Sequence, residues 1–588
     1  MILDKINMPQ DLKTLSADEL NKLADEMRAL IIKKANTIGG HLGPNLGIIE
    51  ATIAMHYVFN CPEDKIVFDV SHQCYPHKIL TGRKEGFLNP ENYLKYTGYT
   101  APEESVCDLF KVGHTSTSVS LAAGVAKARD LAGSKENVIA IIGDGSLSGG
   151  EAYEGLNNAA VLNSNIIIVV NDNDMSIAEN QGGLYKNLEL LRNTNGKAEN
   201  NFFKTLGFEY FYEGEGNNIE RMIKAFKKVK DTKCPTVLHI KTIKGLGLAD
   251  ADKNREIYHW ILPGTLDKKP EISSAAPVED YNTITKDFIL NKAKSDPSII
   301  AINPATPGVF GFNKDFRKQM GQQYTDVAIS EEHAVAYASA LAKCGAKPIL
   351  CIMSSFIQRT YDQLSQDLCL NNSPATLLVY WGAISGADCT HLGCFDIPLI
   401  SNIPNMVYLA PTCKEEYLSM LEWSAEQSDY PVAIRVPFGK FVTTGVKDET
   451  DYSILNLFKI TQSGENIAII GVGNFYHLAL DAAAAIETKL GFKPTVINPG
   501  FLTGLDTECL ETLKKNHNIV ITLEDGVLDG GFGEKISRYY GSSDMKVLNF
   551  GAKKDFTDRI PVEELYQRYH LTPELILEDI ENIMPARV

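Results

Sequence analysis

The stretch from Gly143 to Asn173 constrains the fold of this chain more than any other part of the sequence. It reads GDGSLSGGEAYEGLNNAAVLNSNIIIVVNDN and follows the apolar run Val138–Ile142. Residues Glu151–Val161 have helical spacing, and a second apolar run, Ile166–Val170, leads into Asn-Asp-Asn. Apolar runs on either side of a helix are typical of buried parallel strands, so the stretch predicts a strand–loop–helix–strand unit. Such units bind ligands at the carboxyl ends of their strands.

Two polar positions in this stretch have the chemistry of a metal site that binds a diphosphate. Asp144 stands between Gly143 and Gly145, which let the backbone turn sharply and approach a phosphate closely. Asn173 follows the second strand with a neutral amide oxygen, and the Met175 carbonyl adds a third oxygen. A site with so few protein oxygen ligands suits Mg²⁺, because this ion completes its coordination shell with water and phosphate oxygens. Gly-Asp-Gly alone also occurs as a plain turn, but an Asn after the next strand makes it the thiamin diphosphate fingerprint.

Composition and charge narrow the possible partners. The chain has 588 residues and a net charge of -17, which argues against nucleic-acid binding and against an anionic membrane surface. A phosphate site must therefore be built locally, from a metal, helix N-termini or a few cations. Met1–Leu20 lacks the apolar core of a signal peptide, and no apolar run approaches the length of a membrane span. Eleven scattered cysteines, of which Cys389 and Cys394 are the closest pair, are interpreted as reduced thiols, which favours the cytoplasm.

Three short loops that carry histidine precede the metal motif. They are GGHLGPNLG with His41, SHQCYPHK with His72 after the short strand Phe68–Val70, and GHTSTS with His114. The last loop opens the Ala-rich helix Val119–Leu131, whose N-terminus presents free N–H groups suited to a diphosphate. A lone histidine is more often structural, and three unrelated surface loops are the alternative. The position of all three loops before one metal motif favours the interpretation that they form the walls of one cleft.

The remaining patterns predict three α/β domains in series, at 1–270, 280–440 and 452–588. A Ser16-x-x-Glu19 capping box begins the first long helix. The polar stretches Asp267–Val278 and Phe441–Asp451 are the predicted linkers, and Asn-rich Gln181–Asn201 is a predicted mobile loop.

The second and third domains each contain one stretch that could bind a ligand. In the second domain, a predicted strand ends at Glu331 and the Ala-rich helix Ala334–Ala342 follows, so this acid could simply stabilise the helix dipole. In the third domain, the glycine turn after Asn466–Ile470 lacks the full dinucleotide pattern and is interpreted as structural.

The chain resembles the 1-deoxy-D-xylulose-5-phosphate synthase family of transketolase-like thiamin diphosphate enzymes. The matching strings run from about residue 38 to the C-terminal helix, and they are GGHLGPNLG, FDVSHQCYPHKILTGR, GHTSTSVS, IIGDGSLSGGEAYEGLNNA, NDNDMSIAEN, SEEHAVAYASALA, SFIQRTYDQ, GADCTHLGCFD, IPNMVYLAP and GGFGEKI. The region after Asn180 is shorter than is usual in the family. The resemblance implies two thiamin-diphosphate-binding-type parallel sheets, a transketolase C-terminal-type domain, a homodimer, and a place in isoprenoid and thiamine biosynthesis.

The resemblance also implies roles for individual residues. Asp144, Asn173 and the Met175 carbonyl would ligate Mg²⁺. Glu331 matches the glutamate that hydrogen-bonds the aminopyrimidine ring and so promotes loss of the C2 proton, and Phe356 matches the aromatic residue that packs on that ring. The polar residues around the reacting carbons, which could act as acids or bases, would be His41, His72, His114, His259, His391 and Asp388. The other positions that match cofactor contacts are Gly113, Thr115, Gly143, Gly145, Ser146, Lys244 and Arg359.

The acceptor half of the site departs from the family pattern. The family binds its substrate phosphate with a Tyr before Ser-Thr-Phe, an Arg before Ala-Gly, and an Arg on the last strand of the second domain. Here the first position is Met353 and the second is Trp381, and only the third survives, as Arg435. The GADCTH turn is one residue short, Lys244-Gly-Leu-Gly lacks a second cation, and Gln-His after the glutamate is Glu332-His333.

Three functions are therefore open from the sequence. The first is a 1-deoxy-D-xylulose-5-phosphate synthase that condenses pyruvate, with decarboxylation, with glyceraldehyde 3-phosphate. The second is a paralogous carboligase or transketolase-type enzyme that accepts a different aldehyde or ketose, which could lack a phosphate. The third is a protein that binds the cofactor without catalysis, and the presence of Glu331 argues against it. Release of CO₂ from pyruvate with and without acceptors would separate them.

Overall fold

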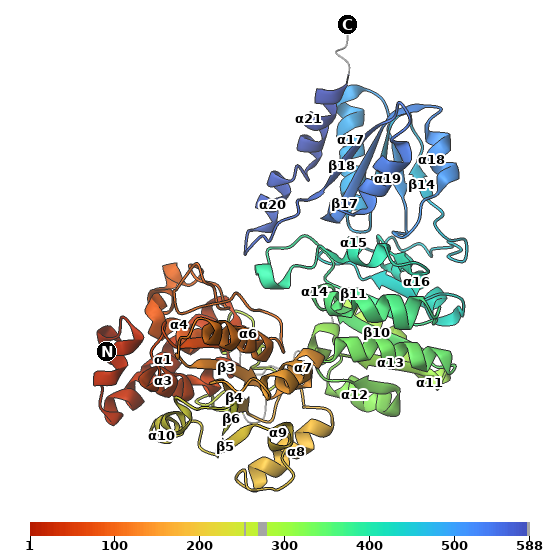
Figure 1. Cartoon of the computed structure of the whole chain (residues 1–588). Coiled ribbons are helices and arrows are strands. Elements are labelled where there is room, and N and C mark those ends of the chain that lie inside the picture. The colour runs from red at the N-terminus through yellow and green to blue at the C-terminus, as the bar shows by residue number, and fades with distance from the viewer. Residues whose placement is uncertain (252–254, 268–278, 585–588) are drawn as a thin grey trace. The chain divides into compact units, whose positions relative to one another are not determined.

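The computed structural model describes residues 1–251, 255–267 and 279–584, and the chain forms two compact units (Figure 1). Unit 1 comprises Met1–Ala276 with Val327–Ser330, and unit 2 comprises Pro277–Asp326 with Glu331–Val588. The linker predicted at Asp267–Val278 lies outside the described residues except for its first position. Among the described residues, no helix has the length and apolar character needed to cross a membrane.

Unit 1 is built on a parallel five-stranded sheet. Its two central strands are the apolar runs on either side of Gly143–Asn173, which pair in parallel along Ile139–Gly143. Strands buried on both faces need apolar residues at every position, which explains why these runs do not alternate. In spatial order the strands are β2 (Lys65–Phe68), β3 (Val138–Gly143), β4 (Ile167–Asp172), β6 (Thr236–Lys241) and β5 (Glu209–Glu213).

Helices cover both faces of this sheet (Figure 1). Alternate residues of β3 point to opposite sides: Ala140 and Ile142 join one core, whereas Ile139 and Ile141 join the other. The first core is closed by α6 (Ser118–Leu131), α7 (Gly150–Ala159), α8 (Gly183–Asn193) and α9 (Phe202–Leu206). The second is closed by α3 (Ile49–Val58) and α10 (Ile219–Val229). The strand–loop–helix–strand prediction is confirmed.

The first long helix begins where the capping box predicts. In α1 (Ala17–Ile38) the Ser16 Oγ accepts from the Glu19 N–H at 3.3 Å, and Glu19 Oε2 accepts from the Ser16 N–H at 3.0 Å. The shorter elements of unit 1 are β1 (Gly40–His41), α2 (Gly43–Gly47), α4 (Tyr75–Lys78), α5 (Glu85–Leu88) and β7 (Trp260–Ile261).

The segment predicted as a mobile loop, Gln181–Asn201, instead contains the helix α8. Tyr185, Leu188 and Leu191 lie at helical spacing and are buried in the core of unit 1. The surrounding polar and Asn-rich residues hide this period in the sequence, and tertiary packing decides the conformation.

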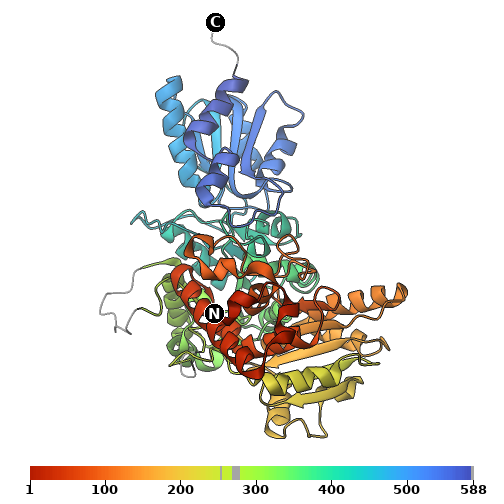
Figure 2. The ribbon, with the colours of Figure 1, turned by 90° about the vertical axis from the view of Figure 1, so that its left-hand side faces the viewer.

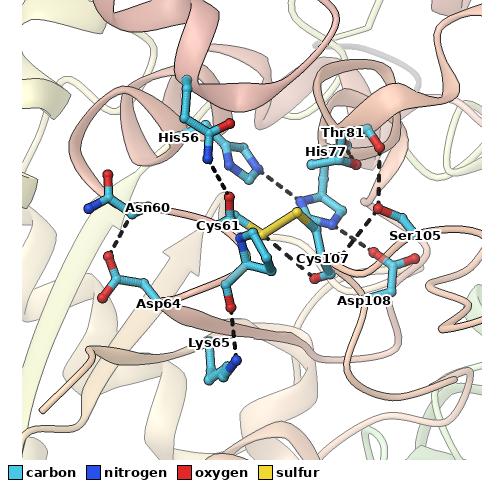
Figure 3. The surroundings of a disulfide bond; sticks show 12 residues. His56, Asn60, Cys61, Asp64, Lys65, His77, Thr81, Ser105, Cys107 and Asp108 are labelled. Atoms are coloured by element: carbon cyan, nitrogen blue, oxygen red, sulfur yellow. Dashed lines mark hydrogen bonds and ion pairs between the residues drawn. A yellow bond between two sulfur atoms is a disulfide. The ribbon is translucent and has the colours of Figure 1, made fainter. Parts of the chain in front are cut away.

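The prediction of reduced thiols is wrong for one pair of cysteines. Cys61, which follows α3, forms a disulfide with Cys107, and their Cα atoms are 5.8 Å apart (Figure 3). A buried polar chain lies beside it, in which His77 contacts both His56 and Asp108 at 2.8 Å. The partners are 46 residues apart, so their spacing gave no signal. In the described part of the chain, the other nine cysteines form no disulfide.

Unit 2 contains a parallel six-stranded sheet followed by a mixed five-stranded one. The order of the first is β12 (Val407–Leu409), β13 (Val432–Arg435), β11 (Thr376–Tyr380), β10 (Lys347–Met353), β8 (Ile299–Asn303) and β9 (Tyr324–Asp326). The helices of this part are α11 (Tyr281–Ser295), α12 (Lys314–Met320), α13 (Glu331–Lys343), α14 (Ser354–Ile357), α15 (Asp396–Ser401) and α16 (Lys414–Glu426).

One boundary in this sheet differs from the prediction. The strand expected to run to Glu331 ends at Asp326, and Glu331 is instead the first residue of α13. Ala328, with φ of 60°, interrupts the extended backbone between them.

The second sheet of unit 2 has the order β14 (Lys459–Gln462), β16 (Thr495–Asn498), β15 (Asn466–Gly471), β17 (His517–Val527) and β18 (Lys546–Ala552), with only β14 antiparallel to its neighbour. Helices flank it on both faces (Figure 2), and they are α17 (Phe475–Leu490), α18 (Thr507–Leu513), α19 (Phe532–Tyr540), α20 (Val562–Arg568) and α21 (Pro573–Ile583). The predicted class, with three consecutive α/β sheets, is confirmed.

Candidate active site

The predicted metal ligands lie at the carboxyl ends of the two central strands of unit 1. Asp144 follows β3 and is 1% exposed, and its Oδ2 accepts from the Met175 N–H at 3.0 Å and from Asn180 Nδ2 at 2.8 Å. Asn173 follows β4, and its Oδ1 atom is buried without a hydrogen-bond partner among the described residues. A buried amide oxygen with no partner costs free energy unless something else satisfies it, and a hard cation would do so.

The pKa of Asp144 also fits a bound cation. Burial, followed by the nearby Asp172 carboxylate, raises the pKa of Asp144 to about 7. A bound cation would offset both effects. In the described part of the chain no three His, Cys, Asp or Glu side chains converge as a metal centre.

Three of the predicted histidines of unit 1 meet at one place. The ring centroid of His41 lies 5.0 Å from that of His72 and 5.5 Å from that of His259, and His72 and His259 are 5.4 Å apart. Asn45 joins the first two loops, because its Nδ2 donates to the carbonyls of His41 and His72, both at 2.8 Å. The pairing of His41 with Trp260 in β1 and β7 brings His259 to the same point.

His259 is suited to accept a proton. Burial, followed by the positive charge of Lys244 and the ring of His72, holds the pKa of His259 well below its usual value. The ring is therefore neutral near pH 7, and its Nδ1 is buried without a hydrogen-bond partner among the described residues. A neutral imidazole with one unpartnered nitrogen is a candidate base.

Asp69 orders the loop that contains Gly113, His114 and Thr115. Its two carboxylate oxygens accept from the Ser116 N–H at 2.8 Å and from the Ser118 N–H at 3.0 Å. Ser71 Oγ donates to the Val112 carbonyl at 2.5 Å, so the His72 loop and this loop are held together. Neither Asn45 nor Asp69 was predictable as a site residue from the sequence, since each acts through contacts far from its own motif.

The glycine turn after β3 approaches two further loops closely. A Cβ on Gly145 would meet Ser176 Oγ at 2.9 Å, whereas around Gly143 there is open space. Lys244 is 4% exposed, and its Nζ donates to the Ser176 carbonyl at 2.6 Å. Burial lowers the pKa of Lys244 to about 8 although the Asp144 carboxylate opposes the shift. Ser146 takes part through its carbonyl, which accepts from Ser116 Oγ at 2.8 Å.

The remaining predicted site residues belong to unit 2. Glu331 is 3% exposed at the start of α13, and its Oε2 lies 3.8 Å from Arg359 Nη1. Burial raises the pKa of Glu331 to about 7, against the pull of Arg359. The rings of Phe356 and His391 meet edge to face, with centroids 5.8 Å apart. A carboxyl with a pKa near 7 can give or hold a proton at neutral pH.

Comparison with known proteins gives family matches over three consecutive segments of the chain. A family model described as 1-deoxy-D-xylulose-5-phosphate synthase matches residues 3–200 and 194–242, the transketolase pyrimidine-binding domain matches 280–441, and the transketolase C-terminal domain matches 458–576. A 1-deoxy-D-xylulose-5-phosphate synthase from Dictyoglomus thermophilum is 37% identical over 623 aligned residues, covering 99% of each chain. The enzyme of the same name from Carboxydothermus hydrogenoformans is 37% identical over 628 aligned residues, covering 99% of each chain. That from Clostridium acetobutylicum is 35% identical over 617 aligned residues, covering 98% of this chain and 99% of the relative.

The chain belongs to the 1-deoxy-D-xylulose-5-phosphate synthase family.

Members of this family are transketolase-type transferases that depend on thiamin diphosphate and require Mg²⁺. The residues of this chain fit both thiamin diphosphate and Mg²⁺. The unpartnered Asn173 Oδ1 and the buried Asp144 fit a divalent cation, and the open space at Gly143 leaves room beside the turn.

The positions that depart from the 1-deoxy-D-xylulose-5-phosphate synthase pattern lie in unit 2. Arg435 is 3% exposed and donates from Nε and Nη2 to Asp396 at 2.7 and 3.0 Å, and from Nη2 to the Asp525 carbonyl at 2.6 Å. Met353 is 5% exposed in the core of the same unit. Both side chains are therefore directed into the protein.

Trp381 and His391 line a cavity of about 780 Å³ in unit 2, together with Phe438, Lys440, Asn474 and Tyr566. Trp381 is 44% exposed. Asp388, from the shortened turn, lies 3.9 Å from Arg559 Nε. The only Lys or Arg side chain among the residues that line this cavity in the described structure is Lys440.

Proposed function

We propose that this chain condenses pyruvate, with loss of CO₂, with glyceraldehyde 3-phosphate to form 1-deoxy-D-xylulose 5-phosphate. The family match over the whole chain supports the reaction. The observation that carries the cofactor assignment is the buried Oδ1 of Asn173, which has no hydrogen-bond partner among the described residues and belongs to the loop whose Met175 N–H donates to Asp144.

The protein's part in the reaction is to bind, orient and move protons. Asp144, Asn173 and the Met175 carbonyl would hold Mg²⁺, and the loops ordered by Asp69 would offer N–H groups to a diphosphate. When bound, thiamin diphosphate supplies a carbon nucleophile that can stabilise negative charge after decarboxylation. Glu331, with its raised pKa, would share a proton with the pyrimidine ring. The neutral His259 would accept one from substrate.

The metal assignment is tested by calorimetry on Asp144→Ala. We expect the variant to lose measurable binding of thiamin diphosphate in the presence of Mg²⁺. Asp64→Ala is the matched control, because Asp64 is also a buried carboxylate of unit 1 but binds Asn60 and Asn137 instead. Equal affinity in wild type and Asp144→Ala would reject the assignment.

A second candidate is an enzyme that prefers an acceptor without a phosphate. It is favoured by the bonding of Arg435, which is committed to Asp396 and to the Asp525 carbonyl. The two candidates differ in their use of acceptors, so a panel of phosphorylated and unphosphorylated aldehydes with saturating pyruvate separates them.

We also infer a homodimer in the cytoplasm, with domains at 1–270, 280–440 and 452–588. The dimer is supported by exposed apolar side chains on and beside α6 and α7, which include Leu131 and Val161. The family models, which match 3–242, 280–441 and 458–576, support the boundaries. The nine cysteines outside the disulfide support a reducing compartment.

A further inference from the structure

The helix α8 contacts both halves of the proposed metal site. It follows the Asn173 loop in the chain and ends at Asn193. The match to the family model is divided into two segments, 3–200 and 194–242, which overlap immediately after this helix. The chain therefore departs from the family model next to α8, and the contacts of α8 need their own explanation.

The C-terminal end of α8 holds the Asn173 loop through one guanidinium. Arg192 Nη1 donates to both oxygens of Asp172 at 2.8 Å, and Nη2 donates to Asp174 Oδ1 at 2.6 Å. Asp172 and Asp174 are the residues immediately before and after Asn173. The side chain of Arg192 is 9% exposed and that of Asp172 is 0% exposed, so solvent screens the first pair weakly.

The Asp172 carboxylate is also fixed from the opposite side. His239 Nε2 lies 2.8 Å from Asp172 Oδ2, and the Tyr210 hydroxyl lies 2.8 Å from His239 Nδ1. Because His239 also binds Asp172, this carboxylate is fixed from two sides. The Arg192 guanidinium is positioned by Asp172 and in turn positions Asp174. Asp174 has a φ of 61°, a conformation that is unfavourable for a residue other than glycine and needs support from its surroundings.

The N-terminal end of α8 reaches the other metal loop. The Tyr185 hydroxyl lies 3.2 Å from the Gly145 carbonyl and 3.3 Å from the Asp144 carbonyl, and the side chain is 8% exposed. Tyr185 and Arg192 are two helical turns apart and lie on the same side of α8. One rigid element therefore touches the backbone after β3 and the backbone after β4.

We propose that α8 is a brace that presets the two metal-binding loops, with Arg192 and Tyr185 as positioning residues for the cation. Arg192 fixes the turn in which Asn173 and the Met175 carbonyl face the metal, and Tyr185 fixes the turn that carries Asp144. The proposal rests on the proposed use of Mg²⁺ with thiamin diphosphate, and it deepens that assignment.

The test compares metal affinity in Arg192→Met, Arg192→Lys and wild type. Mn²⁺ serves as the probe, titrated in the presence of thiamin diphosphate and followed by electron paramagnetic resonance. We expect Mn²⁺ to bind at least about tenfold more weakly to Arg192→Met. Arg192→Lys should recover part of the loss, since an ammonium can contact one carboxylate but cannot bridge two as a guanidinium does.

Arg221→Met is the matched control. Arg221 also pairs with a carboxylate of unit 1, Glu213, but at the end of β5 and outside the metal loops. This control should keep wild-type Mn²⁺ affinity. Tyr185→Phe removes only a hydroxyl from a packed side chain, so it reports on the brace even if Arg192→Met fails to fold, and we expect at least about threefold weaker binding.

The outcomes separate this proposal from the proposed function. If the wild type binds no Mn²⁺ with thiamin diphosphate, the cofactor assignment fails. If the wild type binds it and both Arg192→Met and Tyr185→Phe bind it within twofold of the wild type, the brace is rejected. If Arg192→Met weakens binding no more than Arg221→Met does, the effect is general and the brace is likewise rejected.

Discussion

Several residues near the proposed site adopt backbone conformations that non-glycine residues rarely adopt. Val70, Ser71 and Ser116 have φ values of 56°, 60° and 77°, and Asp174 and Trp381 both have φ of 61°. Each such residue costs on the order of 1–3 kcal/mol and persists only when its surroundings hold it. In unit 1 those surroundings are identified: Asp69 binds the Ser116 N–H, and Arg192 binds Asp174. At Ser116 and Asp174 the strained backbone is therefore held by contacts from other parts of unit 1.

Replacing the buried acid at the start of α13 should stop turnover without loss of the fold. We expect Glu331→Ala to reduce turnover by about two orders of magnitude or more, because it removes the proton partner of the pyrimidine ring. Much of the affinity for thiamin diphosphate should remain, since the diphosphate contacts are elsewhere. Exchange of the cofactor C2 proton, followed by NMR, measures the step directly. Exchange at the wild-type rate in Glu331→Ala would contradict the assignment.

The acceptor phosphate should be bound weakly in the wild type. Met353 and Trp381 replace a phenol and a guanidinium, each of which would contribute roughly 1.5–3 kcal/mol through a charge-assisted hydrogen bond. We therefore expect KM for glyceraldehyde 3-phosphate to be at least about tenfold higher than in a site with all three polar groups. Steady-state kinetics with saturating pyruvate measure it.

Trp381→Arg is the more informative restoration, because Trp381 is 44% exposed on the cavity whereas Met353 is 5% exposed in the core. It should lower KM for the phosphorylated aldehyde and leave KM for an unphosphorylated one unchanged. A low-micromolar KM in the wild type would show that other groups compensate.

At the scale of single elements, two of the buried acids lie at or contact the start of a helix. Glu331 begins α13, and Glu524 accepts from the first N–H groups of α19, those of Phe532 and Gly533, at 2.8 and 2.9 Å. The N-terminus of a helix favours a negative charge, but burial opposes it. For Glu524 burial is the larger effect and raises its pKa from 4.5 to about 7.

Stability should therefore decrease as pH rises past the ordinary pKa of Glu524. Because the folded-state pKa is the higher one, the folded protein binds the proton more tightly, so the contribution is fully present below pH 4.5 and is lost by about pH 7. The shift corresponds to about 3 kcal/mol. Thermal unfolding at pH 5 and 7.5 should show a smaller loss for Glu524→Gln than for the wild type. Glu534→Gln, on the same helix, should behave like the wild type, and an equal pH dependence in all three proteins would contradict the prediction.

At the scale of the whole molecule, the chain contains two compact units, and each contains some of the predicted site residues. Unit 1 holds the metal loops and the cluster of His41, His72 and His259, and unit 2 holds Glu331 and the acceptor positions. Unit 1 also carries exposed apolar side chains on and beside α6 and α7.

We expect a homodimer whose interface includes this surface. Leu131, Tyr153 and Val161 are 78%, 41% and 71% exposed. Light scattering at micromolar concentration should give twice the 64.8 kDa of one chain. Leu131→Asp with Val161→Asp should shift the mass toward a monomer, whereas Leu370→Asp, at an exposed position of unit 2, should not. A monomer mass for the wild type would refute the dimer.

Local patterns in the sequence determined the order and type of the main elements. Three of these patterns are the apolar runs of β3 and β4, the capping box at Ser16 and the Gly-Asp-Gly turn. Each depends on residues that are close together in the chain, so each can be predicted from a short stretch of sequence. The position of Asp144 and Asn173 after two adjacent parallel strands was predictable for the same reason, since the carboxyl ends of parallel strands meet at one edge of a sheet.

The tertiary structure alone decided which distant residues support the site. Asn45, Asp69 and Arg192 each join loops that are separate in the chain, and Arg435 is committed to Asp396. The disulfide and the helix α8 depend likewise on burial against distant partners. Such contacts leave no period or spacing in the sequence, because their free energy comes from removing polar and apolar groups from water together, which happens only when the chain has folded.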